Sequence, residues 1–523
     1  MSDFTNPFLS FLLRHRVKSA LVFLNTLFGF LGIFFSLNGV LPLGLGNFIF
    51  FSTLIFLMAL YRPIWIFLLL IGMLPYEIVD LAPAEFGIFL RPYQWLMLIL
   101  FLAIATRSLA KRPFFPPFHF VWTDALPVLF SAGAFLSGFG SVSFGSSEKL
   151  ALILGSFVVL FFLIRFFVRT ERAAVQLLPF LLSSCGVVII WSITQNILFA
   201  LGKESFQVMA GRPNGTFPES DWLGMYLLFP IALSLAWLYR NDILKKTMYG
   251  NILPIGVLFL GVLTLLLSMT RSAWLGLAGM GIFFSGAVLI TFLKLGDPKR
   301  AFLLLGKSGV TVCLALAAVP ILHLSRFSLF DRAISVGGVQ EITIACVEAG
   351  KAPERIHDVG ELAGYGCQHI LLEEKESFLE AGYIVREIGR DDPNISIRQS
   401  VYGRAVSLAY EHPLRGIGWG AIGSELGTDE RGSALNASNM FLEFWLGSGL
   451  IGLFAFSLLW FAYGFQSGKV ALTGGGSEVA FHLFFHLVWI GFSIFNLFNS
   501  GILLGIFFAF LGLGGILFPK IKE

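Results

Sequence analysis

The chain has 523 residues, of which 56% are hydrophobic and only 13% are charged, and its mean hydropathy is +0.81. A soluble domain of this size has too little interior to hide so much apolar surface. These values exclude a soluble globular protein and predict a polytopic membrane protein. The formal net charge of +4 is too small to indicate nucleic-acid binding.

Apolar runs follow one another along most of the chain and predict an all-α transmembrane bundle. Arg14, Arg16 and Lys18 precede the first run, and no convincing cleavage site follows it, so we expect a retained helix. Spanning segments must satisfy their own backbone polar groups, which favours helices. Because several of the roughly fourteen runs are short, we expect about 12–14 spans. The runs are centred near residues 28, 50, 69, 98, 129, 158, 188, 231, 260, 282, 312, 450, 488 and 509.

Lysine and arginine residues cluster after every second run. The positive-inside rule predicts that these clusters are cytoplasmic, which places both termini in the cytoplasm and makes the number of spans even. The segments expected on the outer face are then residues 202–221, a hairpin around residue 271, and residues 325–435. The clusters are Arg14/Arg16/Lys18, Arg62, Arg107/Lys111/Arg112, Arg165/Arg169/Arg172, Arg240/Lys245/Lys246, Lys294/Lys299/Arg300, Lys469 and Lys520/Lys522.

We expect three parts in the chain: membrane helices at 1–204, a core at 205–465 that includes the outer segment 325–435, and further membrane helices at 466–523. Within the outer segment, residues 369–390 have the pattern of an amphipathic helix. Cys346 and Cys367 lie in the same segment and would pair if it faces an oxidising compartment, a bond that the sequence leaves open. The role of residues 333–395 is equally open, and Gly474–Gly476 predicts a short cytoplasmic turn.

A single charge, Arg271, interrupts about forty otherwise uncharged residues between Ile252 and Leu293. That length is about two crossings of roughly 20 residues each, so Arg271 is predicted at the hairpin between two membrane helices. A charge there needs water, a counter-charge or an anionic ligand. Arg271 is therefore either an interfacial anchor or an anion-binding residue at the membrane surface.

A second outward element is the segment GRPNGTFP, residues 211–218, directly before a predicted helix. Its glycines and prolines predict a tight turn. Asp221 stands where it could cap the helix, and Arg212 together with the helix N-terminus would form an anion-binding cradle. An ordinary loop with a capped helix is the alternative.

Two further outward elements follow the long polar segment. A helix with Arg404 is expected to break at Pro413 into a glycine-rich loop, whose backbone N–H groups could approach a phosphate. Asn439 and Glu443 then enter a long span at a spacing that places both on one helix face. Small residues at Gly447, Gly449 and Gly452 allow close helix packing in the same span.

Taken in order, these four elements resemble the O-antigen ligase / O-antigen polymerase superfamily of bacterial inner-membrane proteins. The resemblance covers roughly residues 205–460. The family's histidine before the asparagine, which is associated with activity in the ligase branch, is Ser438 here. The matching residues are Arg212, Gly215 and Phe217; Thr270, Arg271, Leu275 and Gly276; Arg404, Pro413, Gly416 and Gly418; and Asn439, Leu442, Gly449, Leu450 and Gly452.

The resemblance implies a glycosyltransferase that moves a polyprenyl-diphosphate-linked glycan onto a lipid or glycan hydroxyl at the periplasmic face of the inner membrane. The planar fork of arginine suits a diphosphate, so Arg212, Arg271 and Arg404 are expected to bind it, with Asn439 as a further ligand. The arginines can supply the positive charge, so neither a metal nor another cofactor is expected. Glu443 and Asp221 are the candidates for the general base.

Several alternatives stay open on the sequence alone. A transporter or flippase of lipid-linked sugars would also have many spans, and Ser438 favours a non-catalytic scaffold for envelope assembly. Ligase, polymerase and protein-glycosylating branches share the patterns above, and the donor sugar, the acceptor and the oligomeric state are not determined. His482 and His486 stand four residues apart, which would suit a metal, but no Cys or carboxylate accompanies them and we interpret them as packing residues.

Overall fold

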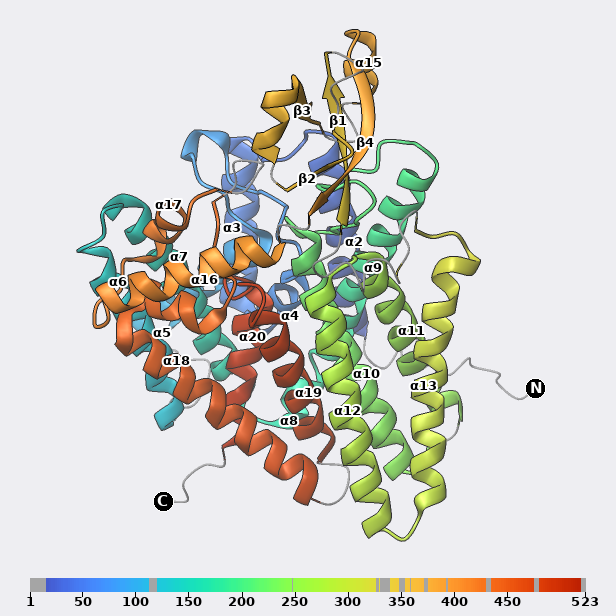
Figure 1. Ribbon diagram of the computed structural model, residues 1–523. Coiled ribbons are helices and arrows are strands. Elements are labelled where there is room, and N and C mark those ends of the chain that lie inside the picture. The colour runs from blue at the N-terminus through green and yellow to red at the C-terminus, as the bar shows by residue number, and fades with distance from the viewer. Residues whose placement is uncertain are drawn as a thin grey trace.

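In the computed structural model the chain is a bundle of long helices with a small sheet at one end (Figure 1). The structure describes residues 16–111, 120–246, 248–325, 329, 339–347, 353–357, 359–370, 375–391, 394–428, 434–474 and 479–518. Arg14, Arg112, Lys520 and Lys522 of the basic clusters, and most of the predicted Gly474–Gly476 turn, lie outside these residues.

Each of the predicted spans falls on a helix, which confirms the all-α membrane bundle. The helices at the predicted positions are α2 (Arg16–Leu37), α3 (Leu45–Tyr61), α4 (Pro63–Met73), α5 (Pro92–Leu109), α6 (Ala125–Gly138), α7 (Phe144–Phe167), α9 (Leu178–Ala200), α10 (Ser220–Ile243), α11 (Ile252–Leu267), α12 (Arg271–Lys294), α13 (Pro298–Ile321), α18 (Met440–Thr473), α19 (Val479–Asn496) and α20 (Gly505–Gly514). The remaining helices are α8 (Glu171–Val175), α15 (Lys375–Glu380), α16 (Asn394–Glu411) and α17 (Ile422–Leu426), with 3-10 turns at Ala84–Phe86, Trp122–Asp124, Met248–Asn251, Val359–Tyr365, Trp419–Ala421 and Gly515–Leu517.

The length and composition of these helices make the chain a multi-pass membrane protein. Among the described residues, ten helical segments are long and apolar enough to cross a membrane, and three shorter apolar helices accompany them. Two of the short ones, α4 and α20, have 11 and 10 residues. At 1.5 Å per residue they reach only about half of a ~30 Å hydrocarbon layer, so each ends or begins inside the bundle.

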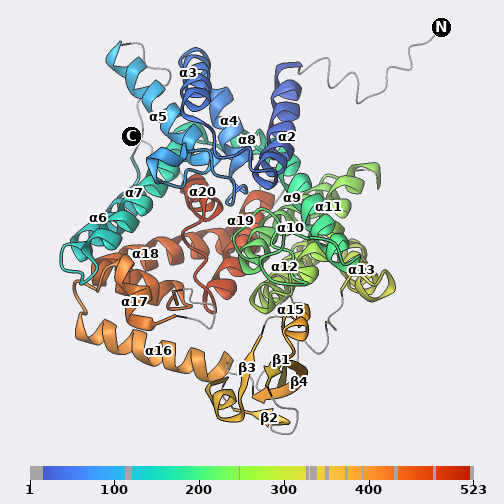
Figure 2. The ribbon, with the colours of Figure 1, turned by 90° about the horizontal axis from the view of Figure 1, so that it is seen from above.

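The spans alternate in direction, so their connections fall at two opposite ends of the bundle (Figure 1). The sheet, the loop after α9, the α11–α12 turn and helix α16 lie at one end, here called the sheet end. The described members of the basic clusters come at the other ends of these helices, opposite the sheet (Figure 1). Figure 2, which views the molecule from above, shows α16 and the sheet at the margin of the bundle beside α18 and α12.

Within the segment predicted to lie outside, residues 339–391 contain a four-stranded sheet with strand order β2-β4-β1-β3. Its strands are β1 (Val339–Cys346), β2 (Arg355–Ile356), β3 (Cys367–His369) and β4 (Ile384–Asp391). β1 pairs antiparallel with β3 and β4, and β2 pairs parallel with β4. The sheet has its own small core, formed by Ile342, Ile344, Cys346, Ile356, Leu362, Cys367 and Ile388.

The predicted amphipathic helix over residues 369–390 is wrong for most of its length. Only Lys375–Glu380 is helical among the described residues, and strands β3 and β4 flank it. Gly382 has a φ of +85° and ends the helix, with its N–H bonded to the Leu379 carbonyl at 3.1 Å. The chain then turns back as β4, because pairing with β1 buries Ile388 in the sheet core.

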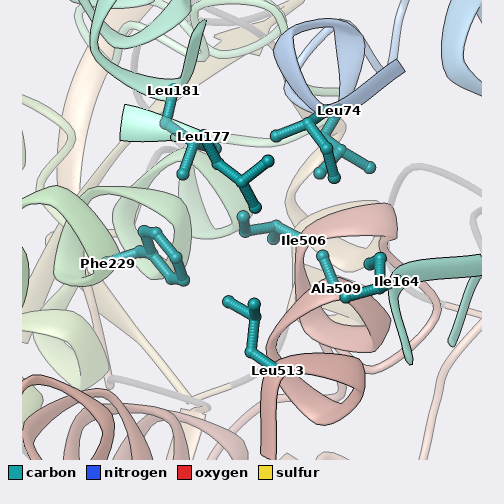
Figure 3. Close-up of a pocket in the computed structure, with 9 residues that line it drawn as sticks. Leu74, Ile164, Leu177, Leu181, Phe229, Ile506, Ala509 and Leu513 are labelled. Carbon is teal, nitrogen blue, oxygen red and sulfur yellow. The ribbon is translucent and has the colours of Figure 1, made fainter. Parts of the chain in front are cut away.

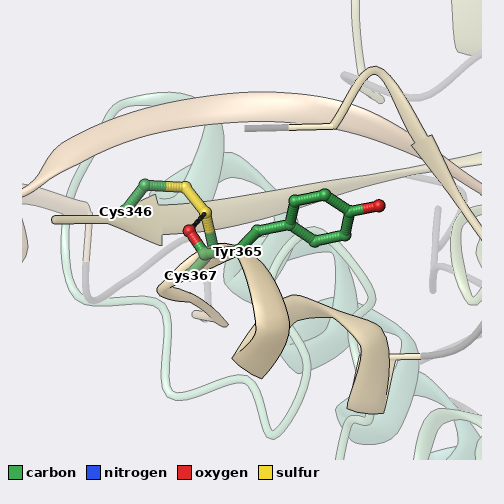
Figure 4. The surroundings of a disulfide bond; sticks show 3 residues. All are labelled: Cys346, Tyr365 and Cys367. Atoms are coloured by element: carbon green, nitrogen blue, oxygen red, sulfur yellow. Dashed lines mark hydrogen bonds between the residues drawn. A yellow bond between two sulfur atoms is a disulfide. The ribbon is translucent and has the colours of Figure 1, made fainter. Parts of the chain in front are cut away.

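A disulfide joins the sheet's neighbouring strands β1 and β3 (Figure 4). Cys346 and Cys367 are buried partners in the strand register, and the Cys367 sulfur also lies 3.6 Å from the Tyr365 carbonyl oxygen. The bond that the sequence left open is therefore present in the structure. It closes the sheet core independently of the helix bundle.

Helix α18 is interrupted at Gly449, where φ is +65° and ψ is −169°. The Leu446 carbonyl accepts from the N–H groups of Ile417 and Gly418, at 2.7 and 3.1 Å, and the Leu450 N–H donates to Leu414 at 3.2 Å. The glycine-rich loop after α16 thus takes over hydrogen bonds that an unbroken helix would make itself. A broken helix at membrane depth is tolerated only where such partners exist.

Candidate functional site

The Arg212 loop packs against the start of helix α10 at the sheet end. The guanidinium Nη2 lies 2.8 Å from an Asp221 oxygen, and Nε donates to the Ser268 carbonyl at 3.2 Å. Gly211 and Gly215 have φ of +71° and +60°, so the predicted tight turn is confirmed. The Gly215 N–H donates to the Gln195 side chain at 2.8 Å, which fixes the turn to α9.

The predicted capping role of Asp221 is wrong. Glu219 is the N-cap residue of α10 and makes no side-chain capping bond, while Asp221 stands within the first turn. Its carboxylate pairs with Arg212, a partner nine positions earlier in the chain. A strong charge-assisted contact therefore takes the carboxylate away from the helix end.

Arg271 is the first residue of α12, in the hairpin that the sequence predicted. The preceding turn, Ser268 to Thr270, places Met269 at a φ of +55°. The Thr270 hydroxyl donates to the Ser220 carbonyl at 3.2 Å, at the N-terminus of α10. A Cβ on Gly224 would lie only 2.9 Å from the Thr270 Cβ, so α10 and α12 approach closely here.

The structure therefore brings Arg212 and Arg271 to one place. Arg212 donates to Ser268, which lies three residues before Arg271 on the same tight turn. The N-termini of α10 and α12 meet there as well, and helix N-termini favour anions because their first N–H groups lack helical partners. Both arginine side chains are half-buried. The result is a cluster of two arginines and one carboxylate, that of Asp221, beside two helix N-termini at the sheet end.

Arg404 comes to the same end on helix α16, but in a more exposed setting. Its guanidinium lies 2.9 Å from Glu425 and 3.7 Å from Glu411, and its side chain is 47% exposed. Tyr402, two residues earlier, donates its hydroxyl to the Ser438 carbonyl at 3.3 Å and to the Leu497 carbonyl at 3.0 Å. Burial raises the pKa of Tyr402, which keeps this hydroxyl protonated as a donor.

The predicted phosphate contact of the glycine-rich loop is wrong. The Gly416 N–H donates to the His412 carbonyl at 2.8 Å, and that of Gly420 donates to the Ser147 hydroxyl at 3.2 Å. Gly418 donates to Leu446 of α18. The glycines are needed for a different reason: a Cβ on Gly416 would lie 2.4 Å from the Leu446 oxygen, and one on Gly420 2.3 Å from Ser146. They allow the loop to pack against α18 and α7.

Asn439 and Glu443 both organise the start of α18. The Asn439 side-chain oxygen accepts from the N–H groups of Phe441 and Leu442, at 2.9 and 3.3 Å, and so caps the helix. Glu443 is only 3% exposed, and its carboxylate accepts from the Ala437 N–H at 2.6 Å and from the Ser500 hydroxyl. Both residues therefore hold the turn that contains Ser438.

The sequence interpretation missed the loop between α19 and α20, residues 497–504. Asn499 donates to the Ser272 hydroxyl at 2.6 Å, Ser500 contacts Glu443, and the Leu497 carbonyl accepts from Tyr402. The loop thus joins α12, α16 and α18. The sequence feature that could have revealed this loop is the polar tripeptide Asn499-Ser500-Gly501. It separates the last two apolar runs, at a connection predicted to face outward.

A second missed element is the loop between α4 and α5, whose first half, around Glu77, is buried. The Glu77 carboxylate lies 2.5 Å from Arg91 and accepts from the Gly505 N–H at 3.1 Å, at the start of α20. The N–H groups of Glu77 and Ile78 donate to the Thr216 carbonyl, at 3.0 and 3.2 Å. This loop is therefore hydrogen-bonded both to the Arg212 loop and to the start of α20.

A small cavity lies deeper in the bundle, between α4, α7, α9, α10 and α20 (Figure 3). Its volume is about 10 Å³, close to the minimum that one water molecule needs. The lining is entirely apolar and includes Leu74, Ile164, Phe229, Ile506 and Leu513. The cavity is therefore a packing gap, separate from the polar cluster at the sheet end.

His482 and His486 contact protein groups on neighbouring elements. The His486 ring nitrogen lies 3.1 Å from the Ser467 hydroxyl and its ring stacks on Trp489, while His482 lies 3.8 Å from Glu171. The packing interpretation of His486 is confirmed. In the described part of the chain, no three His, Cys, Asp or Glu residues are grouped to hold a metal ion.

Comparison with known protein families gives one match over this region, the family described as O-antigen ligase, at residues 256–457. The chain contains an O-antigen ligase family domain. The domain extends from α11 into α18 and includes Arg271, Arg404, Asn439 and Glu443, whereas Arg212 and Asp221 precede it and Asn499 follows it. Neither the curated proteins nor the solved structures give a match to the chain.

Proposed function

We propose that the protein transfers a polyprenyl-diphosphate-linked glycan onto a hydroxyl acceptor at the periplasmic face of the bacterial inner membrane. The observation that carries this proposal is the meeting of Arg212 and Arg271 at the N-termini of α10 and α12. Such a place suits a diphosphate leaving group, whose negative charge grows as the sugar–phosphate bond breaks. The O-antigen ligase family domain supports a glycan substrate.

The sidedness of the site supports the same proposal. The described members of the basic clusters follow helices that end opposite the arginine site (Figure 1), and by the positive-inside rule this favours a sheet end outside the cytoplasm. The disulfide between Cys346 and Cys367 is of the kind that persists in an oxidising compartment such as the periplasm. Two independent features thus favour a periplasmic site.

In the proposed reaction the acceptor hydroxyl oxygen attacks the anomeric carbon of the donor sugar. The carbon–oxygen bond to the diphosphate breaks, and its electron pair leaves with the polyprenyl diphosphate. Arg212 and Arg271 bind the diphosphate oxygens, and Arg404 adds a more distant positive charge. Asn439 holds the turn before α18 and is a further candidate ligand.

The acceptor proton passes to a carboxylate. Asp221 suits this role better than Glu443, because its side chain is 34% exposed while Glu443 is buried and already accepts two hydrogen bonds. Glu443 is then a positioning residue for the Ser438 turn. The substitution of Ser438 for the family histidine makes a non-catalytic scaffold the second candidate function.

Reconstitution in liposomes tests the proposal. The wild-type protein should transfer glycan from the lipid-linked donor to an acceptor, and Arg271→Ala or Arg212→Ala should lower the rate by about 10²–10³, the loss typical of removing one charge-stabilising donor. Lys299→Ala, an exposed cation at the opposite end, is the matched control and should keep the wild-type rate.

A deletion strain separates the branches and the rival functions. Loss of long chains with single units retained indicates a polymerase, and loss of all attached glycan indicates a ligase. Accumulation of the lipid-linked intermediate on the inner leaflet would indicate a flippase and contradict the transferase. Wild-type protein that folds, reconstitutes and transfers no glycan would favour the scaffold.

A further inference from the structure

The α19–α20 loop occupies a central position in the site although it lies outside the matched family domain. Asn499 reaches Ser272 of α12 at 2.6 Å, and Ser272 directly follows Arg271. At its start the loop meets α16 through the hydrogen bond between Tyr402 and the Leu497 carbonyl. The loop therefore lies directly beside the first turn of α12, which begins with Arg271.

The loop is held at both ends by buried side chains. The Gly501 N–H donates to the Asn496 side-chain oxygen at 2.8 Å, and the Gly505 N–H donates to Glu77 at 3.1 Å. A Cβ on Gly501 would lie 2.6 Å from the Met225 sulfur, so the loop also packs tightly on α10. The half-buried Asn499 is thus presented from a fixed backbone.

The chemistry of this side differs from that of the arginine side. Asn499, Ser500, Ser272 and Tyr402 are neutral groups that can both donate and accept hydrogen bonds, which suits sugar hydroxyls. A diphosphate bound at Arg271 carries two substituents, a polyprenyl chain and a sugar. The polyprenyl chain belongs in the bilayer, so the polar side next to Ser272 suits the sugar.

We propose that Asn499 is a specificity-determining residue that hydrogen-bonds the donor sugar directly beyond the diphosphate. This inference rests on the proposed function and adds the place of the sugar within the site. Ser272 shares the side-chain hydrogen bond of Asn499 and orients its amide. The arginines bind the diphosphate, which all such donors share, and Asn499 hydrogen-bonds the sugar, which differs between donors.

The test compares two ligands of the full-length protein in detergent. One is bare polyprenyl diphosphate, and the other is the host's lipid-linked glycan purified from a strain that lacks this protein. Asn499→Ala should weaken binding of the glycan-bearing lipid about five- to tenfold, the range for one lost hydrogen bond, and change binding of the bare diphosphate by less than twofold. Arg271→Ala should weaken both.

Matched variants keep the result interpretable. Asn38→Ala removes an exposed asparagine just after α2 whose amide donates to the Phe34 backbone carbonyl, and this change should leave both affinities unchanged. Asn499→Asp preserves the size of the side chain if the alanine variant does not fold. It should weaken binding of both ligands by placing a negative charge near Arg271, but binding of the glycan-bearing lipid about five- to tenfold more, because only that ligand also loses a hydrogen-bond donor; equal weakening of both would overturn the role of Asn499.

Equal weakening of both ligands by Asn499→Ala, or no weakening of either, would overturn the role of Asn499. A wild-type protein that binds neither ligand would instead remove the proposed function itself. The two failures are therefore distinct in the same experiment.

Discussion

The two ends of the helix bundle use arginine in different ways. At the end opposite the sheet, Arg165 donates through two nitrogens to both oxygens of Asp124, at 2.8 and 3.0 Å, and the two side chains are 8% and 0% exposed. At the sheet end, Arg212 donates to Asp221 through a single nitrogen, at 2.8 Å, and these side chains are 16% and 34% exposed. The Arg212 Nη1 donates to the Met209 sulfur, at 3.3 Å.

This difference separates a structural pair from a candidate binding residue. A carboxylate that fills both sides of the guanidinium fork in a buried place leaves little for a ligand to gain, and breaking the pair exposes a charge to an apolar interior. A thioether is a weak acceptor that a phosphate oxygen can displace. The same residue type therefore stabilises helices at one end and remains able to bind an anion at the other.

The largest effect is expected at the structural pair. Arg165→Ala leaves the Asp124 carboxylate buried without its partner, which typically costs about 3–5 kcal/mol. We expect a large loss of folded protein, measured as the monodisperse fraction after detergent extraction and as the midpoint of thermal unfolding. Arg172→Ala, an exposed member of the same basic cluster, is the control. If the Arg165→Ala variant were as stable as the wild type, the Arg165–Asp124 pair would not be a structural pair and the contrast with Arg212 would be wrong.

An intermediate effect is expected for the two carboxylates at the sheet end. Asp221→Asn removes the proposed general base and should lower transfer about 10²-fold in reconstituted liposomes. Glu443→Gln keeps an oxygen to accept from Ala437 and should lower transfer less than tenfold. Unchanged transfer by Glu443→Gln would exclude a catalytic role for Glu443. A larger loss at Glu443 than at Asp221 would reverse the assignment.

The smallest effect is expected at Arg404. Its exposed guanidinium forms ion pairs with Glu425 and Glu411. Because an exposed charge contact contributes at most about 1 kcal/mol, Arg404→Ala should lower the transfer rate by about fivefold or less. Because salt screens exposed charges, the difference from wild type should shrink between low and high ionic strength. A loss as large as that of Arg271→Ala would place Arg404 within the diphosphate site itself.

The sequence predicted the positions of the helices well because the membrane imposes one rule on every span. An apolar run must form a helix whatever its neighbours are, so local composition is sufficient. The same argument failed over residues 369–390, which lie outside the membrane. There, the strand pairing of β4 with β1 and the burial of Ile388 outweighed the local helical pattern.

The site was predicted in part, for a related reason. Arg271 was identifiable because a charge inside an apolar run is expensive and therefore informative. The partners of Arg212, by contrast, depend on the close approach of α10 and α12 at Gly224. The hydrogen bonds of Gly416, Gly418 and Gly420 depend on the break in α18, which no local pattern in the loop reveals.

The sequence alone determined that this protein is a bundle of membrane helices with Arg271 at a hairpin between two of them, because hydropathy and loop charge act locally along the chain. Only the tertiary structure decided that Arg212 meets Arg271, that Asp221 pairs instead of capping, and that Asn499 reaches Ser272 across more than two hundred residues. Those contacts follow from how half-helices and tight turns pack together. Packing depends on three-dimensional complementarity between distant segments, which the order of residues does not display.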